Sequence, residues 1–229
     1  MQRYFIVLLL LIVAFGSGCA KSIPKEELFP QMYTEAPKSI VVLPPMNITS
    51  AVDAKGYYST TLAEPFSENG YYVFSIPVTS ELLKSEGVYD TELLYELPVA
   101  KFHDYFGADA VLFTTINKWD LVYYVIGGHL AVGFDCELRS TKTENILWKH
   151  SRELIINLTP SSGNLLVDII ATAINAAIVD YIDYARQANY LLMNDMPYGP
   201  YHKEHLQDGK KPVIIPYQKP SKAKEDNAG

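Results

Sequence analysis

Histidine is the residue type in this chain whose spacing is easiest to test for chemistry. His202 and His205 are close enough to bind one metal ion together, but no cysteine or pair of carboxylates beside them completes a tetrahedral set. The sequence also has no glycine-rich phosphate loop, no helical zinc motif and no nucleophile elbow. We therefore predict no metal site, no cofactor and no catalytic residues. The remaining histidines stand apart from one another, at His103, His129 and His150.

Cysteine is the second reactive type, and the chain has two, Cys19 and Cys136. Cys136 lies in a segment that alternates apolar and polar residues, which is typical of a strand. Its own side of that strand is apolar, so we expect a buried and unreactive thiol. One face carries Leu130, Val132, Phe134, Cys136 and Leu138, and the other carries Ala131, Gly133, Asp135, Glu137 and Arg139.

Cys19 follows a segment with the three parts of a secretory signal. One cation, Arg3, precedes an apolar run over residues 5–15, and small residues at 16–18 stand directly before the cysteine. The apolar run is shorter than the about 20 residues that a membrane-spanning helix needs. We therefore predict a removable signal peptide over residues 1–18.

The small residues before Cys19 resemble the lipobox of bacterial lipoproteins, although Gly16 stands where that motif usually has leucine. The resemblance implies that the Cys19 sulfur receives a diacylglycerol and that lipid anchors the mature chain. Two or three acyl chains, palmitate among them, anchor a protein stably, whereas a single chain binds only marginally. The residue after the cysteine is Ala20 and not Asp. By resemblance to the enterobacterial sorting rule, this implies transfer to the outer membrane. The domain is then expected in the periplasm, with exposure at the cell surface as an alternative.

The net charge limits the partners that the chain can bind. The formal charge is −7, and loss of residues 1–18 removes one cation, Arg3, so the mature chain carries −8. An acidic protein gains nothing from neutralising phosphates, so we expect no nucleic-acid partner. With Cys19 acylated, Cys136 has no partner for an intramolecular disulfide.

The segments that must position these residues follow from composition and periodicity. We predict a lipidated tether over 19–37, a single domain over 38–195 and a tail rich in proline and tyrosine over 196–229, with a disordered end. Within the tail, the apolar island 213–215 is expected to add an edge strand or to dock on the domain. A partner-binding strand is the alternative for this island.

The domain is predicted to open with a strand, a helix and a strand. Strand 39–43 precedes a helix marked by Leu62 and Phe66, which ends at Asn69 and Gly70, and strand 71–76 follows. Polar helices are predicted over 79–86 and 91–106.

Three long strands are predicted next. Strand 110–118 continues through 119–126, Gly127 and Gly128 form a hairpin turn, and strands to Arg139 and over 146–158 complete an antiparallel meander. From 166 to 185 apolar residues recur every three or four positions, which predicts a long C-terminal helix packed on the sheet. The fold class is therefore α/β (α+β), with a mixed sheet.

Three segments resemble counterparts, in the same order, in a group of envelope proteins: SIVVLPPMN, FGADAVLFTTINKWD and CELRSTKTENILWKHS. The pattern resembles the domain shared by the curli-secretion lipoprotein CsgG, the penicillin-binding-protein activator lipoproteins and the amino-terminal domain of TolB. More closely, the chain resembles an uncharacterised family of Gram-negative lipoproteins, some of them meningococcal vaccine candidates and often encoded beside a CsgG-like lipoprotein. The resemblance, over roughly residues 38–190, implies the fold, and it carries over no catalytic residue.

Three hypotheses for the function follow. The first, which we expect, is a non-enzymatic envelope lipoprotein that binds or assembles other proteins, with a CsgG-like partner implied by the resemblance and a homo-oligomer left open. The second is a subunit of an oligomeric secretion pore, in which hairpin 119–139 inserts in a membrane with Asp135, Glu137 and Arg139 facing a lumen. The third is an enzyme whose Asp, His and Tyr side chains converge only in the fold.

Overall fold

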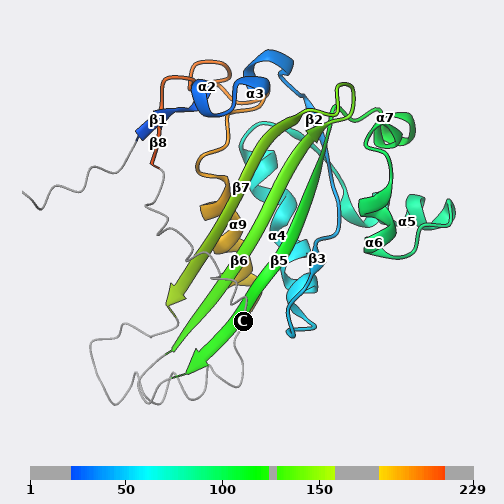
Figure 1. The fold of residues 1–229 in the computed structure, drawn as a ribbon, viewed down its shortest axis with the longest axis vertical. Coiled ribbons are helices and arrows are strands. Elements are labelled where there is room, and N and C mark those ends of the chain that lie inside the picture. The colour runs from blue at the N-terminus through cyan, green and yellow to red at the C-terminus, as the bar shows by residue number, and fades with distance from the viewer. Residues whose placement is uncertain (1–21, 124–127, 158–180, 215–229) are drawn as a thin grey trace, which may run out of the picture.

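A mixed β-sheet forms the centre of the domain (Figure 1). The computed structural model describes residues 22–123, 128–157 and 181–214. The strands of the sheet are arranged in the order β4-β2-β5-β6-β7, and β3 also pairs with β5. Their bounds are β2 (Ser39–Val42), β3 (Met46–Asn47), β4 (Tyr72–Phe74), β5 (Ala110–Tyr123), β6 (Gly128–Ser140) and β7 (Ile146–Asn157).

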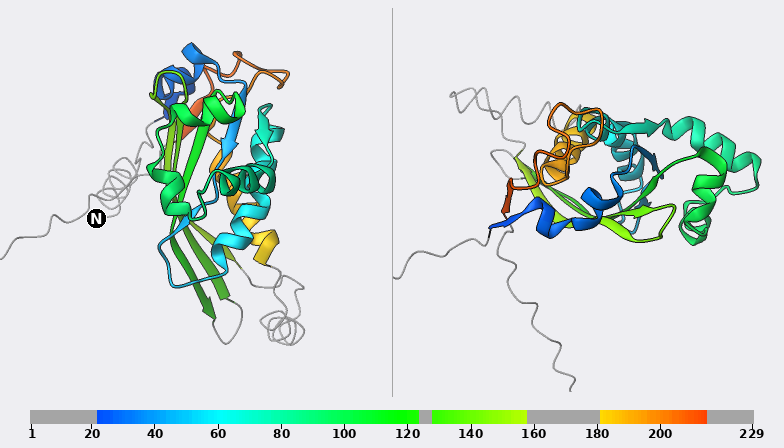
Figure 2. Two further views of the ribbon diagram at one scale, coloured as in Figure 1. Left: turned by 90° about the vertical axis from the view of Figure 1, so that its right-hand side faces the viewer. Right: turned by 90° about the horizontal axis from the view of Figure 1, so that it is seen from above.

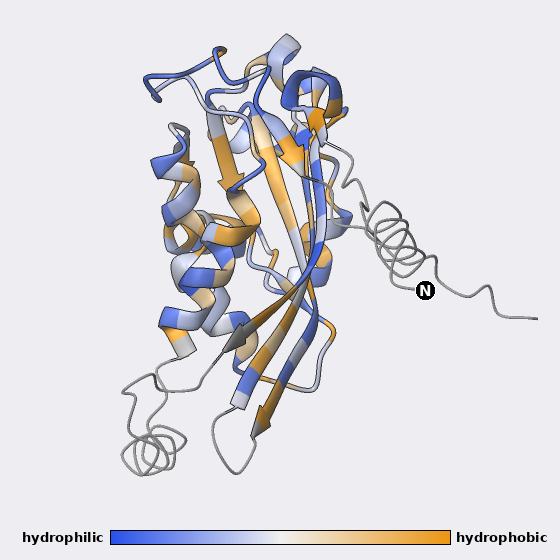
Figure 3. Cartoon of the chain, turned by 90° about the vertical axis from the view of Figure 1, so that its left-hand side faces the viewer, coloured by the Kyte–Doolittle hydropathy of each residue, from blue (hydrophilic) through white to orange (hydrophobic). Residues whose placement is uncertain are grey.

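The sheet combines parallel and antiparallel pairing, as predicted. β2 lies parallel to both β4 and β5, which is the outcome expected when a helix connects two strands. β5, β6 and β7 form the antiparallel meander, with Ala110 opposite Ser140 and Tyr123 opposite Gly128. The side chains of successive strand residues point to opposite faces, and Figure 3 shows apolar and polar bands alternating along the long strands.

Helices cover the two faces of the sheet unequally (Figures 1 and 2). On one face α4 (Ala54–Glu68) and α9 (Tyr181–Met193) pack on apolar residues of the whole sheet, including Leu112, Phe134 and Leu138. On the other face α5, α6 and α7 contribute Leu83, Leu94 and Phe102 to a smaller cluster around Val41 and Val111. This second layer packs on β2 and β5, and it leaves much of β6 and β7 uncovered. The bounds of its helices are α5 (Ile76–Ser85), α6 (Thr91–Glu96) and α7 (Ala100–Phe106).

Proline accounts for two differences from the predicted helices. Pro98 separates α6 from α7, where the sequence predicted one helix over 91–106, because proline disfavours a helical conformation in the residue before it. Pro77 lies in the first turn of α5, where its missing N–H costs nothing, and it does not close strand 71–76 as predicted. α4 ends as expected, with Asn69 after the helix and Gly70 at φ 85°.

The segment after Cys19 differs from the predicted tether. Residues 22–35 form β1 (Ser22–Pro24), α2 (Lys25–Leu28) and α3 (Pro30–Glu35), which lie against the domain. Phe29 and Met32 are buried in the main core, and Lys25 is only 5% exposed. The prediction was wrong here because an irregular pattern of short elements has no period that sequence analysis can detect.

The described part of the tail is also folded. β8 (Pro212–Ile214) pairs antiparallel with β1, so Val213 and Ile214 of the apolar island lie in a strand of a small second sheet. The carboxylate of Asp208 is fully buried and accepts hydrogen bonds from Tyr33, the Tyr198 N–H and Lys25. These contacts join the two ends of the described chain. The predicted disorder at the end of the tail and the part of the predicted helix before Tyr181 fall outside the described residues.

Candidate functional site

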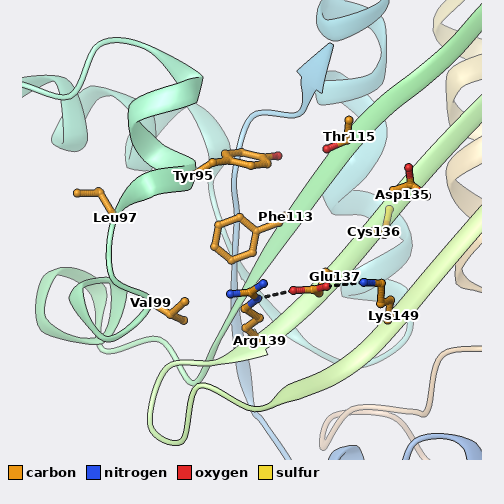
Figure 4. Close-up of a pocket in the computed structure, with 10 residues that line it drawn as sticks. All are labelled: Tyr95, Leu97, Val99, Phe113, Thr115, Asp135, Cys136, Glu137, Arg139 and Lys149. Carbon is orange, nitrogen blue, oxygen red and sulfur yellow. Dashed lines mark hydrogen bonds and ion pairs between the residues drawn. The ribbon is translucent and has the colours of Figure 1, made fainter. Parts of the chain in front are cut away.

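A groove lies on the face of the sheet opposite α4 and α9, where the cover provided by α6 and α7 ends (Figure 4). It encloses a cavity of about 270 Å³. We call it the sheet-face groove. One wall comes from the segment between α6 and α7, and the floor comes from β5, β6 and β7. Its lining residues are Tyr95, Leu97, Val99, Phe113, Thr115, Asp135, Cys136, Glu137, Arg139 and Lys149.

The aromatic part of the groove is held in place by hydrogen bonds to the sheet. The Tyr95 ring meets Phe113 edge to face, with ring centroids 5.1 Å apart. Its hydroxyl donates to the Thr114 carbonyl at 2.6 Å and accepts from the Thr114 N–H at 2.9 Å. Burial raises the pKa of Tyr95, so the hydroxyl remains a donor at neutral pH. The wall and floor of the groove are therefore fixed relative to each other.

A charge network lies beside the aromatic pair. The Glu137 carboxylate accepts from Arg139 Nε on one oxygen and from Lys149 Nζ, at 3.0 Å, on the other. Burial alone would raise the pKa of Glu137, but the hydrogen bonds from Lys149 and Arg139 outweigh it and lower that pKa. The Arg139 guanidinium also lies 5.6 Å from the Phe113 ring centroid, a cation–π distance. The groove thus places fixed charges next to an apolar surface.

Cys136 contributes no reactive group to this site. Its thiol is buried and donates to the Thr114 hydroxyl at 3.6 Å. Burial raises the pKa of Cys136 to about 12, and the thiolate is the form that reacts. The expectation of a buried thiol is confirmed. The Cys136 thiol is therefore protonated at neutral pH.

The two histidines that are close in sequence, His202 and His205, both contact Tyr198. The His202 ring stacks on Tyr198 with centroids 3.8 Å apart, and His205 Nδ1 lies 2.8 Å from the Tyr198 carbonyl. Within the described ranges, no three side chains of His, Cys, Asp or Glu converge as metal ligands. The same ranges contain no helix that is long and apolar enough to cross a membrane. Cys19, the predicted site of lipid attachment, falls outside them.

Asp135, Glu137 and Arg139, which would face a lumen under the pore alternative, line the sheet-face groove. The alternating pattern correctly placed them on one face of β6. Sequence analysis missed Tyr95 and Lys149. Tyr95 lies 40 residues before Asp135, Lys149 lies on another strand, and only the fold brings them together.

Comparison with known proteins gives the family. The profile of the family described as "Putative lipoprotein GNA1162-like" matches residues 29–196, which include the sheet, its helices and the groove. The chain belongs to this family. The resemblance to a meningococcal lipoprotein family is thereby confirmed.

Individual relatives agree with the family match. "Putative lipoprotein NMB1124/NMB1162" of Neisseria meningitidis serogroup B is 29% identical over 139 residues, which are 61% of this chain and 65% of that protein. The match therefore spans less than two thirds of that relative. The crystal structure of lipoprotein GNA1162 from N. meningitidis is 28% identical with a TM-score of 0.51, and covers 63% of this chain and 99% of that chain. Members of the family thus share this fold.

Proposed function

We propose that this chain is an envelope protein, anchored to the outer membrane by lipid on Cys19, whose periplasmic domain binds another protein and catalyses no reaction. Membership of a lipoprotein family supports the lipid anchor. The observation that carries the binding role is the sheet-face groove, where Tyr95 and Phe113 lie beside a fixed network of charges.

The chemistry of the groove fits a peptide segment better than a small polar substrate. Leu97, Val99 and Phe113 offer an apolar surface, and aromatic residues held rigidly give contact area at low entropic cost. Arg139 and Lys149 flank this surface and are 43% and 65% exposed, so they are available to a partner's carboxylates. The resemblance found in the sequence makes a CsgG-like lipoprotein the first partner to test.

The fold gives less support to the pore alternative. Leu130, Val132 and Phe134 on β6 are fully buried in the core formed with α4 and α9. An apolar strand face that packs on helices of its own domain cannot also face lipid. The opposite face of the same strand carries the charged residues of the groove. Insertion of hairpin 119–139 would therefore require the domain core to open.

Site-specific photocrosslinking in cells tests the proposed binding site. A photoreactive amino acid replaces Leu97 in the groove or, as a control, the exposed Ser67 on α4, on the opposite side of the sheet. We expect a discrete adduct with one envelope protein from position 97 and none from position 67. An adduct with a second copy of this chain would identify a homo-oligomer.

A charge variant provides a second control. Lys149→Glu reverses a charge in the groove and should weaken the adduct from position 97. Lys101→Glu reverses an exposed charge on α7 and should leave the adduct unchanged. Lys101 pairs with an exposed carboxylate. Lys149 is itself 65% exposed, and Glu137 keeps its hydrogen bond from Arg139, so neither change should unfold the domain. Absence of an adduct at position 97, or equal adducts at both positions, would rule out the groove as the binding site.

A further inference from the structure

The distance between the lipid and the folded domain is short. Only Ala20 and Lys21 separate Cys19 from Ser22, where β1 begins. Three residue steps span at most about 11 Å, whatever conformation they adopt. β1 is itself fixed to the domain, since it pairs with β8 and is followed by Lys25, whose N–H donates to the Lys211 carbonyl at 3.0 Å. A lipid on Cys19 therefore holds this end of the domain against the bilayer.

One loop at this end exposes residues suited to a bilayer surface. We call residues 199–211 the C-terminal loop; it lies beside α2, where the Glu26 N–H donates to the Gly209 carbonyl at 3.0 Å. Tyr201 and Leu206 are 71% and 54% exposed. Tyrosine is enriched at membrane interfaces, and leucine partitions into the acyl region. Neither residue belongs to the buried core.

The charges of the C-terminal loop also favour contact with phospholipid. Lys203, Lys210 and Lys211 are exposed in a chain whose net charge is −7. Of the two acidic residues in the loop, Asp208 is buried and Glu204 pairs with Lys211. The exposed carboxylates on the adjacent α2, those of Glu26 and Glu27, offset part of this positive charge. We therefore assign the main contact to the two apolar side chains, with the lysines reaching headgroup phosphates.

The C-terminal loop is rigid enough to present these residues in one arrangement. The N–H groups of Gly199 and Tyr201 donate to the carbonyls of Asn69 and Gly70 at 2.8 and 3.0 Å. Leu206 itself has φ 59°, a left-handed conformation that is unusual for leucine. A fixed loop loses little entropy on docking.

We propose that the C-terminal loop docks on the phospholipid leaflet that holds the lipid anchor, with Tyr201 and Leu206 entering the headgroup region. The inference rests on the proposed acylation of Cys19 and adds a second, non-covalent contact. Docking orients the domain. Figure 1 shows α2, β1 and the loop at one end of the molecule, whereas the end of β5 and the start of β6 lie at the other. The hairpin then points away from the anchoring leaflet.

The test uses the acylated full chain in vesicles of phosphatidylethanolamine and phosphatidylglycerol. An environment-sensitive fluorophore is attached to a cysteine introduced by Leu206→Cys or, as a matched control, by Ile155→Cys. Ile155 is 71% exposed near the opposite end, on β7. Cys136 does not compete for the label because its thiol is buried. Mass spectrometry confirms acylation of each protein before reconstitution, so a missing anchor is not confused with failed docking.

The expected result is a blue shift of the label at position 206 and quenching by lipid-attached quenchers, with neither effect at position 155. The double variant Tyr201→Ser/Lys203→Ser should reduce the shift at position 206. Unchanged emission at position 206 in acylated protein would overturn the docking surface while leaving the lipid anchor intact. Quenching at position 155 without quenching at 206 would overturn it as well, and would support insertion of the hairpin end.

Discussion

The Tyr95 hydroxyl occupies the place of a strand partner for the backbone of Thr114. β2 and β3 flank β5, and between them stand Pro44 and Pro45, which have no N–H to donate to the sheet. Leu43 and Ile48 donate to the carbonyls of Leu112 and Ile116 on either side of this gap. Between these two carbonyls, the carbonyl of Thr114 accepts its hydrogen bond from the hydroxyl of Tyr95. One side chain from α6 thus closes the sheet and forms a wall of the groove.

Tyr95→Phe should destabilise the domain. It leaves the N–H and carbonyl of Thr114 without their hydrogen bonds in a buried position, which costs about 1–3 kcal/mol. Chemical denaturation followed by circular dichroism measures the loss. Tyr89→Phe removes a hydroxyl from a side chain that is 72% exposed and should change stability little. Equal stability of the two variants would contradict the role assigned to the Tyr95 hydroxyl.

Asp208→Asn should destabilise the contact between the two ends of the described chain. The change leaves the Lys25 ammonium, at 3.4 Å from the carboxylate, buried without its counter-charge. Breaking a buried ion pair by removing one partner costs roughly 3–5 kcal/mol. Limited proteolysis and denaturation should both show the loss, with early cleavage near residues 22–35.

The double variant Lys25→Met/Asp208→Leu provides the control for this pair. It removes both charges together. Its loss of unfolding free energy should therefore be smaller than the sum of the losses in Lys25→Met and Asp208→Leu. A cost equal to that sum would mean that Lys25 and Asp208 stabilise the protein independently.

His150 should make the domain less stable in acid. Its ring stacks on Trp148, and its Nε2 has no hydrogen-bond partner among the described residues. Burial lowers the pKa of His150 below the ordinary 6.5; Asp195 opposes this shift and Arg152 adds to it. Because the folded-state pKa is the lower one, the unfolded chain binds the proton first. The contribution of His150 is complete above pH 6.5 and is lost as pH falls toward the folded-state pKa.

Denaturation of the protein at several pH values below neutrality measures this effect. In the His150→Gln variant, the free energy of unfolding should fall less steeply as the pH is lowered. His103→Gln, at an exposed position on α7, should show the same pH dependence as the parent protein. Identical slopes in the parent and in His150→Gln would assign the acid sensitivity to other groups.

Cys19→Ala should prevent acylation, because no other residue offers the sulfur that the modification requires at this position. Mass spectrometry should then find no diacylglyceryl adduct, and the protein should leave the membrane fraction. Replacement of Cys136 by alanine is the matched control and should leave acylation unchanged. Normal processing and normal membrane retention of Cys19→Ala would contradict the lipid anchor.

Regular periodicity made much of the fold predictable. The meander of β5, β6 and β7 was predicted from the alternation of apolar and polar residues. A strand places successive side chains on opposite faces, so the apolar ones face the core and the polar ones face solvent. The same alternation correctly buried Cys136 and placed Glu137 on the opposite face. The lipid site was predicted from local sequence alone, because modification depends on the residues next to Cys19.

Only the tertiary structure decided which distant residues meet. The pairing of Lys25 with Asp208 joins residues separated by 183 positions, and it turned a predicted tether into part of the domain. Tyr95 and Lys149 join Glu137 and Arg139 in one groove because the sheet brings their elements together. Local sequence determines periodicity and modification through short-range chemistry, whereas such contacts depend on the packing of the whole core. That is why the sequence alone predicts the lipid anchor, whereas the fold shows the surfaces that the domain presents.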